Sequence, residues 1–347
     1  MQIGNMDRIR LGLFPTPLQE LTQLAKHLGG PRIFIKRDDM NGLGLGGNKL
    51  RKLEYAFAEA QSQGATTVIT IGGLQSNHVR LTTAAANRLG MKTVLILRGA
   101  KPERPSGNLL VDEMLGPEEI HYVDIDGHPE KGEWDEVSAQ KAEKVAERLR
   151  AAGETPFIIP NGCAAFHGAL GYSGCVLEIV AQLREQGLAP TKIVAAIGTS
   201  SMLTGLLLGT HLYTHGEAEV LGISVVSTPK DELTAKICGQ LDEANRRLAL
   251  SHPVPHEAVR VLDAYVGEGY GIPSDATYEA LVLLARSEGL VLDPVYTGKT
   301  MAGLIDLTQR GELAADDVVV FIHTGGIPGL FADEKTAGVA GYLESAA

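Results

Sequence analysis

Short apolar runs that alternate with helical patterns constrain this fold more than any other feature of the chain. Aliphatic and β-branched residues cluster at 32–36, 67–71, 93–97, 119–123, 156–159, 192–197, 220–226 and 317–322. Helical patterns separate most of these runs, at 50–60, 75–89, 168–186, 202–213, 228–248, 274–287 and 298–309. Parallel strands are buried on both faces and need helical crossovers, so the alternation predicts an α/β fold with mostly parallel sheets. The polar intervals 98–106 and 127–136 are predicted surface loops.

Length and composition narrow the class of protein. A chain of 347 residues is long enough for two domains, and a net charge of −11 argues against nucleic acid as the main partner. The start of the chain lacks the apolar segment of a signal peptide, and no run reaches the ~20 apolar residues of a membrane span. Cys163, Cys175 and Cys238 show no metal-type spacing, which favours reduced thiols. We therefore expect a soluble cytoplasmic enzyme.

The glycine-rich loop 42–49, Gly-Leu-Gly-Leu-Gly-Gly-Asn-Lys, lies between a predicted strand and a predicted amphipathic helix. Such a loop offers free backbone N–H groups and lets a ligand approach closely. Lys49 stands at the helix start, where the helix end and partial burial lower the pKa of a lysine and favour the neutral, nucleophilic amine. The alternative is a solvated lysine in a flexible loop, and the other motifs of the chain decide between the two.

Two nucleotide-binding motifs can be tested on this loop. Gly42, Gly44 and Gly47 match the spacing of the dinucleotide fingerprint, yet the next strand ends at Gly72-Gly73 without the acidic residue that binds ribose. The phosphate-loop motif needs a lysine directly after its last glycine, where this chain has Asn48. A non-catalytic nucleotide-binding module is therefore only a remote alternative.

Four further loops follow apolar runs, and the carboxyl ends of strands are where ligands bind in a parallel sheet. Residues 72–78 and 198–205 lead into helices, so each suits either simple N-capping or an anion held on backbone N–H groups. Residues 293–299 and 323–331 contain glycine and proline, and turn formation alone explains part of both.

Other reactive side chains give weaker signals. His211 and His215 stand four residues apart but lack the glutamate of a metalloprotease motif, so we predict no metal site. Tyr265, Cys163 and Cys175 are predicted to serve packing. The chain contains no Gly-x-Ser-x-Gly nucleophile motif.

Taken together, five motifs in this order resemble the pyridoxal-phosphate enzymes of fold type II, the tryptophan-synthase β-subunit type. The similarity is closer to the branch that contains D-cysteine desulfhydrase and 1-aminocyclopropane-1-carboxylate deaminase, and it extends from about residue 13 to residue 331. The motifs are Lys-Arg-Asp-Asp at 36–39, Gly-Gly-Asn-Lys-Leu-Arg-Lys-Leu at 46–53, Gln-Ser-Asn-His at 75–78, Asp-Pro-Val-Tyr-Thr-Gly-Lys at 293–299 and His-Thr-Gly-Gly at 323–326.

The resemblance implies an architecture and a cofactor, pyridoxal 5'-phosphate. Two α/β domains on parallel sheets are expected, a large one from residues 1–50 plus 162–347 and a small one from residues 51–161, with the active site in the cleft between them. Lys49 would form the Schiff base with the cofactor, and Asn77 would hydrogen-bond its phenolic oxygen. The phosphate would be held by Gly198, Thr199, Ser200, Ser201, Met202, Leu203 and Thr204. Relatives are commonly homodimers, so a homodimer is expected.

The resemblance also implies the groups that act on the substrate. Ser76, Asn77 and His78 would hold the carboxylate of a small amino acid, and Lys49 would take its α-proton. Tyr296 would lie against the cofactor ring, and Tyr270 matches a second active-site tyrosine. Either tyrosine could protonate a leaving group. The expected catalytic residues are Lys49, Tyr296, Tyr270 and Ser76.

Two threonines separate members of the branch. Deaminases are similar to this chain but have Glu at the position of Thr297 and Leu at that of Thr324, whereas desulfhydrases have Thr at both, as here. A carboxylate near the pyridine nitrogen keeps it protonated and strengthens electron withdrawal, which opening a cyclopropane demands. A hydroxyl cannot hold that proton, and β-elimination of a good leaving group needs less withdrawal. The resemblance therefore implies elimination from D-cysteine, giving pyruvate, ammonia and sulfide.

Two departures keep other substrates open. Met202 stands where desulfhydrases have Thr, in a phosphate loop that is usually richer in glycine. The family's Gly-Gly-Ser-Asn segment appears as Asn-Gly-Cys-Ala at 161–164. Deamination of 1-aminocyclopropane-1-carboxylate and elimination from L-cysteate by a sulfo-lyase remain alternatives of the same fold.

Overall fold

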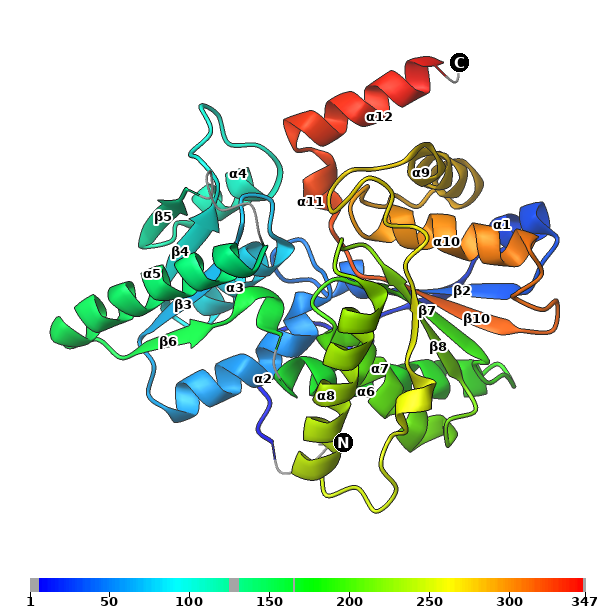
Figure 1. The fold of residues 1–347 in the computed structure, drawn as a ribbon, viewed down its shortest axis with the longest axis horizontal. Coiled ribbons are helices and arrows are strands. Elements are labelled where there is room, and N and C mark those ends of the chain that lie inside the picture. The colour runs from blue at the N-terminus through cyan, green and yellow to red at the C-terminus, as the bar shows by residue number, and fades with distance from the viewer. Residues whose placement is uncertain (1–5, 125–130, 165, 346–347) are drawn as a thin grey trace.

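The computed structural model describes residues 6–124, 131–164 and 166–345, which form two sheets flanked by helices (Figure 1). In the larger sheet the strand order is β1-β2-β10-β7-β8-β9, and only the β1–β2 pair is antiparallel. Its strands are β1 (Leu18–Glu20), β2 (Arg32–Arg37), β7 (Lys192–Ile197), β8 (Glu219–Ser224), β9 (Arg260–Leu262) and β10 (Val318–His323). The smaller sheet is parallel, in the order β5 (Glu119–Val123), β4 (Lys92–Arg98), β3 (Thr67–Gly73), β6 (Pro156–Ile159).

Alternate residues of the larger sheet face two different layers of helices. On β10, Val318, Val320 and Ile322 join one apolar cluster, whereas Val319 and Phe321 join another. This period of two places helices on both faces of the sheet, as the continuous apolar runs predict. One layer consists of α6 (Phe166–Arg184), α7 (Ser201–Thr214) and α8 (Lys230–Arg247), and the other of α1 (Thr22–Leu28), α9 (Asp275–Glu288) and α10 (Thr297–Gln309).

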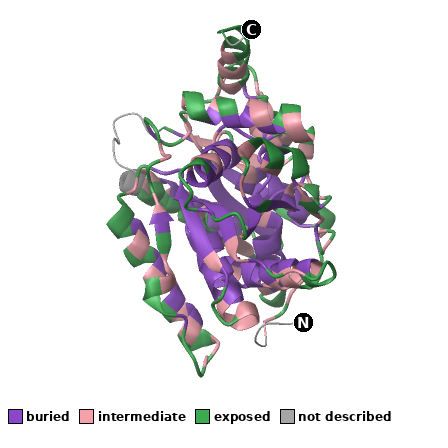
Figure 2. Cartoon of the chain, turned by 90° about the vertical axis from the view of Figure 1, so that its right-hand side faces the viewer, coloured by how far each residue is buried: buried purple, intermediate pink, exposed green. Residues whose placement is uncertain are grey.

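The smaller sheet is also covered on both faces. Ile69 and Val94 pack against α5 (Lys131–Ala151), while Val68 and Leu95 pack on the opposite side. The helices on that side are α2 (Lys49–Ser62), α3 (Asn77–Arg88) and α4 (Gly107–Leu115). The largely buried sheets and the exposed outer faces of the helices are visible in Figure 2. The short α11 (Ile327–Leu330) and the C-terminal α12 (Asp333–Ser345) follow the last strand, and α12 projects from the body.

The α/β prediction is confirmed, and the predicted strands match the observed ones to within about two residues at each end. One prediction is wrong in part, because residues 131–136 belong to α5 rather than to a surface loop; residues 127–130 lie outside the described residues. Charged residues on the exposed side of that helix imitate a loop composition. The strands of the two sheets fall on either side of the predicted division at residues 51 and 161, and the division itself stays a prediction.

Within the described residues, no helix is long and apolar enough to cross a membrane.

Candidate active site

The loop before Lys49 is pressed against the segments that follow two strands of the larger sheet, β2 and β10. A Cβ on Gly46 would lie 1.8 Å from the carbonyl oxygen of Asp39, so only glycine fits there. The Gly47 N–H donates to the carbonyl of Asp38 (3.0 Å), and the Asn48 N–H donates to that of Thr324 (2.9 Å). Two of the predicted motifs, 46–53 and 323–326, are thereby brought together at the start of α2.

Lys49 is the first residue of α2, and its side chain is half-buried. Loss of water around its amine lowers the pKa of Lys49 to about 8, an effect that the nearby Cys163 thiol opposes. Its Nζ donates no hydrogen bond to any residue that the structure describes. The lowered pKa agrees with the prediction, and burial is its main cause. An amine of this kind is a competent nucleophile near neutral pH.

Lys52 is a second lysine of the site, and the sequence analysis missed it. It lies one turn beyond Lys49 on α2 and is fully buried, with its Nζ donating to the Ser201 hydroxyl (2.8 Å). Burial, with the Lys49 amine as the next cause, lowers the pKa of Lys52 well below its usual value. The i, i+3 spacing from Lys49 was the available signal, since such residues share a helix face.

The loop 198–204 forms the buried N-terminus of α7, as predicted. Ser200 adopts a φ of 64°, a conformation that favours glycine. Met202 is buried, and its sulfur lies 3.7 Å from the Asn48 side-chain nitrogen. The turn 161–163 packs beside this loop, because a Cβ on Gly162 would meet the Thr199 side chain at 2.6 Å. Backbone N–H groups at such a helix end favour an anion.

The Asn77 side chain is held in one orientation by two neighbours. Its Oδ1 accepts hydrogen bonds from Asn108 Nδ2 (3.0 Å) and Arg80 Nη2 (3.3 Å). This assignment leaves the amide NH₂ of Asn77 free to donate to a ligand. Arg80 also donates to the carbonyl of Gly46 (3.1 Å), so it joins α3 to the loop that carries Lys49. Sequence reasoning identified neither Arg80 nor Asn108.

The side chains of Ser76 and His78, on either side of Asn77, have different structural roles. Ser76 caps α3, its hydroxyl accepting from the Val79 N–H (3.3 Å). The His78 ring is buried beside β3 and shares a hydrogen bond with the Thr70 hydroxyl (3.1 Å). Any contribution of His78 to substrate binding would therefore come from its backbone N–H at the helix start.

Asp293 organises the start of α10. Its carboxylate accepts from the backbone N–H groups of residues 295–297 and from the Thr297 hydroxyl (2.5 Å). Thr297 therefore has no proton left to offer a ligand. The Thr324 hydroxyl forms no hydrogen bond to any residue in the described part of the chain, so it remains available. Gly326 packs directly against Asp293, where a Cβ would come within 2.7 Å of the carboxylate.

Tyr270 and Tyr296 form a pair. Their hydroxyls are hydrogen-bonded, and the rings lie edge to face with centroids 5.9 Å apart. The Tyr296 ring also lies beside Gly198, at the start of the loop 198–204. Tyr270 is 54% exposed, but loss of water around the two paired hydroxyls raises the pKa of both phenols, and for Tyr296 the neighbouring Tyr270 raises it further. Both tyrosines are therefore protonated at neutral pH and can act as proton donors.

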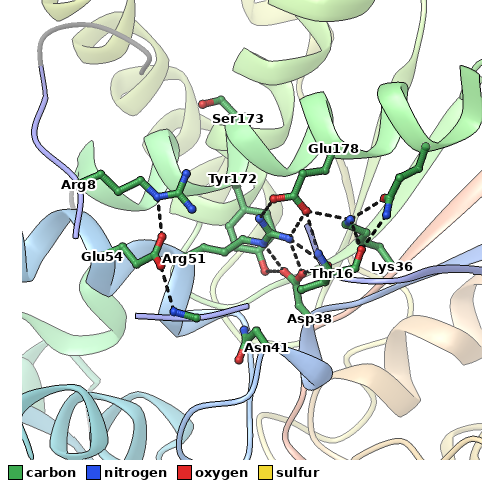
Figure 3. Close-up of polar contacts among 12 residues, drawn as sticks. Arg8, Thr16, Lys36, Asp38, Asn41, Arg51, Glu54, Tyr172, Ser173 and Glu178 are labelled. Carbon is green, nitrogen blue, oxygen red and sulfur yellow. Dashed lines mark hydrogen bonds and ion pairs between the residues drawn. The ribbon is translucent and has the colours of Figure 1, made fainter. Parts of the chain in front are cut away.

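A buried ion network holds the opposite side of α2 (Figure 3). Arg51 points away from Lys49, since residues two apart on a helix face nearly opposite directions. It donates to both carboxylate oxygens of Asp38 (2.8 Å each) and to both of Glu178 (2.8 Å each). Tyr172 donates to Asp38 (2.7 Å), and Lys36 pairs with Glu178 (2.9 Å). This network fixes α2 to β2 and α6.

No group of three or more potential metal-ligating side chains occurs among residues 6–124, 131–164 and 166–345. His211, which the sequence analysis considered, shares a hydrogen bond with the carbonyl of His252 (2.7 Å).

Comparisons with known proteins identify the family of this chain. The model of the pyridoxal-phosphate dependent enzyme family matches residues 9–325. A D-cysteine desulfhydrase of Klebsiella pneumoniae is 39% identical over 340 residues, covering 96% of this chain and 98% of that protein. A Pyrococcus abyssi protein proposed to be a 1-aminocyclopropane-1-carboxylate deaminase is 38% identical over 330 residues, covering 95% and 94%. The crystal structure of a homologue of that deaminase aligns with a TM-score of 0.87 at 35% identity, covering 98% and 97%.

This chain belongs to the pyridoxal-phosphate dependent enzymes, and its fold is that of fold type II. It is a pyridoxal-phosphate-dependent lyase.

The residues present fit this cofactor. An aldehyde needs a neutral amine, which Lys49 supplies, and a phosphate needs an anion site, which the start of α7 supplies together with Lys52. The phenolic oxygen of the cofactor needs a donor, and the Asn77 amide is oriented as one. Tyr296, whose ring lies beside Gly198, and the unbonded hydroxyl of Thr324 would be further groups that hold the cofactor.

We expect Lys52→Met to weaken cofactor binding about 10- to 100-fold, because a charge-assisted hydrogen bond contributes about 1.5–3 kcal/mol. Titration of the cofactor-free protein with pyridoxal phosphate, followed by fluorescence, measures this. Lys26→Met, which changes an exposed lysine of α1, serves as the control and should leave the affinity unchanged. An unaltered dissociation constant in Lys52→Met would show that Lys52 does not hold the phosphate.

Proposed function

We propose that this chain catalyses α,β-elimination from a small amino acid, with D-cysteine giving pyruvate, ammonia and hydrogen sulfide. The observation that carries this proposal is the pair of hydroxyl residues, Thr297 and Thr324, at positions where similar deaminases have Glu and Leu. Thr297 is bound to Asp293, and a hydroxyl cannot hold a proton on a pyridine nitrogen. Relatives named D-cysteine desulfhydrase, at 39% identity, support the same reaction.

The chemistry divides between the cofactor and the protein. When bound, pyridoxal phosphate supplies the sink for the electron pair of the Cα–H bond. Lys49 would hold the cofactor, and its amine would take the α-proton of the substrate as general base. The backbone N–H groups at the start of α3, at residues 76–78, would hold the substrate carboxylate on the positive end of the helix.

The leaving group requires a proton on the other side of the substrate. The C–S bond breaks with its electron pair on sulfur, and a phenolic proton from Tyr270 or Tyr296 would complete hydrogen sulfide. Their hydroxyls are hydrogen-bonded to each other, so a proton can pass from one phenol to the other before it is transferred to sulfur. The enamine that remains hydrolyses in water to pyruvate and ammonia.

A substrate panel tests this proposal against its alternatives. Pyruvate release should be faster with D-cysteine, which also gives sulfide, than with β-chloro-D-alanine, D-serine or L-cysteate. Release of 2-oxobutyrate from 1-aminocyclopropane-1-carboxylate should be at background. Release of 2-oxobutyrate from the cyclopropane would favour the deaminase, to which the Pyrococcus abyssi relative points. Sulfite release from L-cysteate would favour the sulfo-lyase. A purified protein without visible absorbance would favour the nucleotide-binding alternative.

We also propose that the protein acts as a homodimer in the cytoplasm, with large and small domains divided as predicted. The three free cysteines, two of them buried, support a reducing compartment. The separate strand sets of the two sheets support the domain division.

A further inference from the structure

Lys299 is a buried charged residue that the proposed reaction does not use. It lies on the first turn of α10, and its side chain is 0% exposed. Its Nζ donates to the backbone carbonyls of Val266 (2.6 Å) and Gly269 (2.7 Å). No carboxylate in the described part of the chain pairs with it. Burying an ammonium group costs free energy unless its hydrogen bonds are satisfied. The two carbonyls offset part of this cost for Lys299.

The segment that Lys299 holds has little else to fix it. It joins β9 to α9, and Gly267, Gly269 and Gly271 all adopt positive φ (66°, 155° and 78°). A hollow of about 280 Å³ lies along residues 266–269, so side-chain packing does not support that side. On the other side Lys335 of α12 donates to the carbonyl of Gly271 (2.6 Å). Two lysines therefore anchor the backbone of this segment.

Tyr270 stands within this anchored segment, between the carbonyls of Gly269 and Gly271. Its phenol is hydrogen-bonded to Tyr296, which stands immediately before α10. The same end of α10 thus carries Tyr296 itself and, three residues later, the lysine that fixes the backbone beside Tyr270. The first turn of α10 therefore fixes the position of one phenol relative to the other.

We propose that Lys299 is a positioning residue, which holds the 266–271 segment so that the Tyr270 hydroxyl meets that of Tyr296. This inference rests on the proposed function, in which that pair protonates the leaving sulfur. Without the ammonium, two buried carbonyls lose their partner and three glycines leave the segment free to move. The lowered pKa of Lys299, caused by burial and then by Lys335, agrees with an ammonium that no acidic group supports.

The test compares Lys299→Met with Tyr270→Phe and with the double variant. Tyr270→Phe should lower kcat for D-cysteine by about 10²-fold, the usual contribution of a general acid. Lys299→Met should lower kcat to within about threefold of that value, and the double variant should lose no more than about threefold further, because both changes remove the same interaction. Lys335→Met should cost less than about threefold, since water can replace a half-buried amine.

A second readout does not depend on turnover. Amide hydrogen exchange of residues 266–272, measured with and without cofactor, should become at least about tenfold faster in Lys299→Met. Met301→Ala, at a fully buried apolar residue of the same helix, is the matched control and should lower stability without this local change. If Lys299→Met does not fold, Lys299→Gln keeps one donor and should show the same changes to a smaller degree.

Each outcome decides one point. If amide exchange at residues 266–272 is unchanged in Lys299→Met, the proposal is wrong. It is also wrong if exchange is faster in Lys299→Met but that variant turns over normally while Tyr270→Phe is slow. Multiplied losses in the double variant also overturn it. If Tyr270→Phe turns over normally while exchange accelerates in Lys299→Met, the tyrosine role in the proposed function fails, whereas the anchoring of the segment stands.

Discussion

Lys49→Ala is expected to lower kcat/KM for elimination by at least about 10³-fold, because the side chain serves both as the attachment point of the cofactor and as the general base. The cofactor would still bind through the start of α7 and Lys52, but without a covalent bond. The purified variant should therefore lose the visible absorption band of a lysine-bound cofactor. Steady-state kinetics and an absorption spectrum measure both effects.

Lys49→Arg is the matched variant, because it keeps a positive charge but cannot form the covalent bond. It should be as inactive as Lys49→Ala, and both should unfold near the wild-type temperature. In the wild type, the rate of cofactor attachment to the cofactor-free protein should rise with pH through about 8, since only the neutral amine attacks and the pKa of Lys49 lies there. Turnover by Lys49→Ala with an unchanged band would contradict the assignment.

Arg51→Ala is expected to have the largest effect on stability, lowering the free energy of unfolding by about 3–5 kcal/mol. The guanidinium is 1% exposed and bridges the buried carboxylate of Asp38 and the half-buried carboxylate of Glu178. Without Arg51, the two carboxylates lose their shared guanidinium, although Asp38 keeps its hydrogen bond from Tyr172 and Glu178 keeps its ion pair with Lys36. Urea denaturation at neutral pH measures the loss. Arg32→Ala, which breaks an exposed pair with Glu20, is the control and should cost at most about 1 kcal/mol.

The pH dependence of this loss distinguishes an electrostatic cause from lost packing. Burial alone would raise the pKa of Asp38, but Arg51, Tyr172 and Lys36 lower it below its usual value. In the wild type, Asp38 therefore stabilises the fold above its unfolded pKa, and this is lost as pH falls. In Arg51→Ala, burial becomes the dominant effect and raises the pKa of Asp38, so the folded variant holds this side chain in its neutral form at lower pH. The difference between wild type and variant should shrink from pH 7.5 to about 4.5; a constant difference would indicate packing alone.

Much of the fold follows from local patterns in the sequence. The apolar runs predict the strands because a parallel sheet buries both of its faces, as the alternate residues of β10 illustrate. The glycines before Lys49 predict a tight loop, which the contact between Gly46 and Asp39 explains. The loops at strand ends predict a ligand site, and the structure brings the loops at 46–49 and 323–326 together. The role of each residue in that site remains a prediction.

The supporting residues could not be predicted, because their partners lie far away in the sequence. Asn108 meets Asn77 across 31 positions, Lys52 meets Ser201 across 149, and Arg51 meets Glu178 across 127. Local periodicity carries no information about such pairs. The loop expected at 127–136 is wrong for residues 131–136, for a related reason. An exposed helix and a polar loop have similar compositions, and only the packing of later residues of α5, such as Val137 and Ala142, against the sheet shows that a helix begins here.

The central claim is that Lys49, and not its buried neighbour Lys52, carries the cofactor. Borohydride reduction of the purified protein fixes pyridoxal phosphate to the lysine that holds it, and peptide mass spectrometry then locates the modified residue. The structure assigns the Lys52 amine to Ser201 and leaves that of Lys49 free. We predict a pyridoxyl group on Lys49 alone. A modification on Lys52, or on no lysine of α2, would contradict the account.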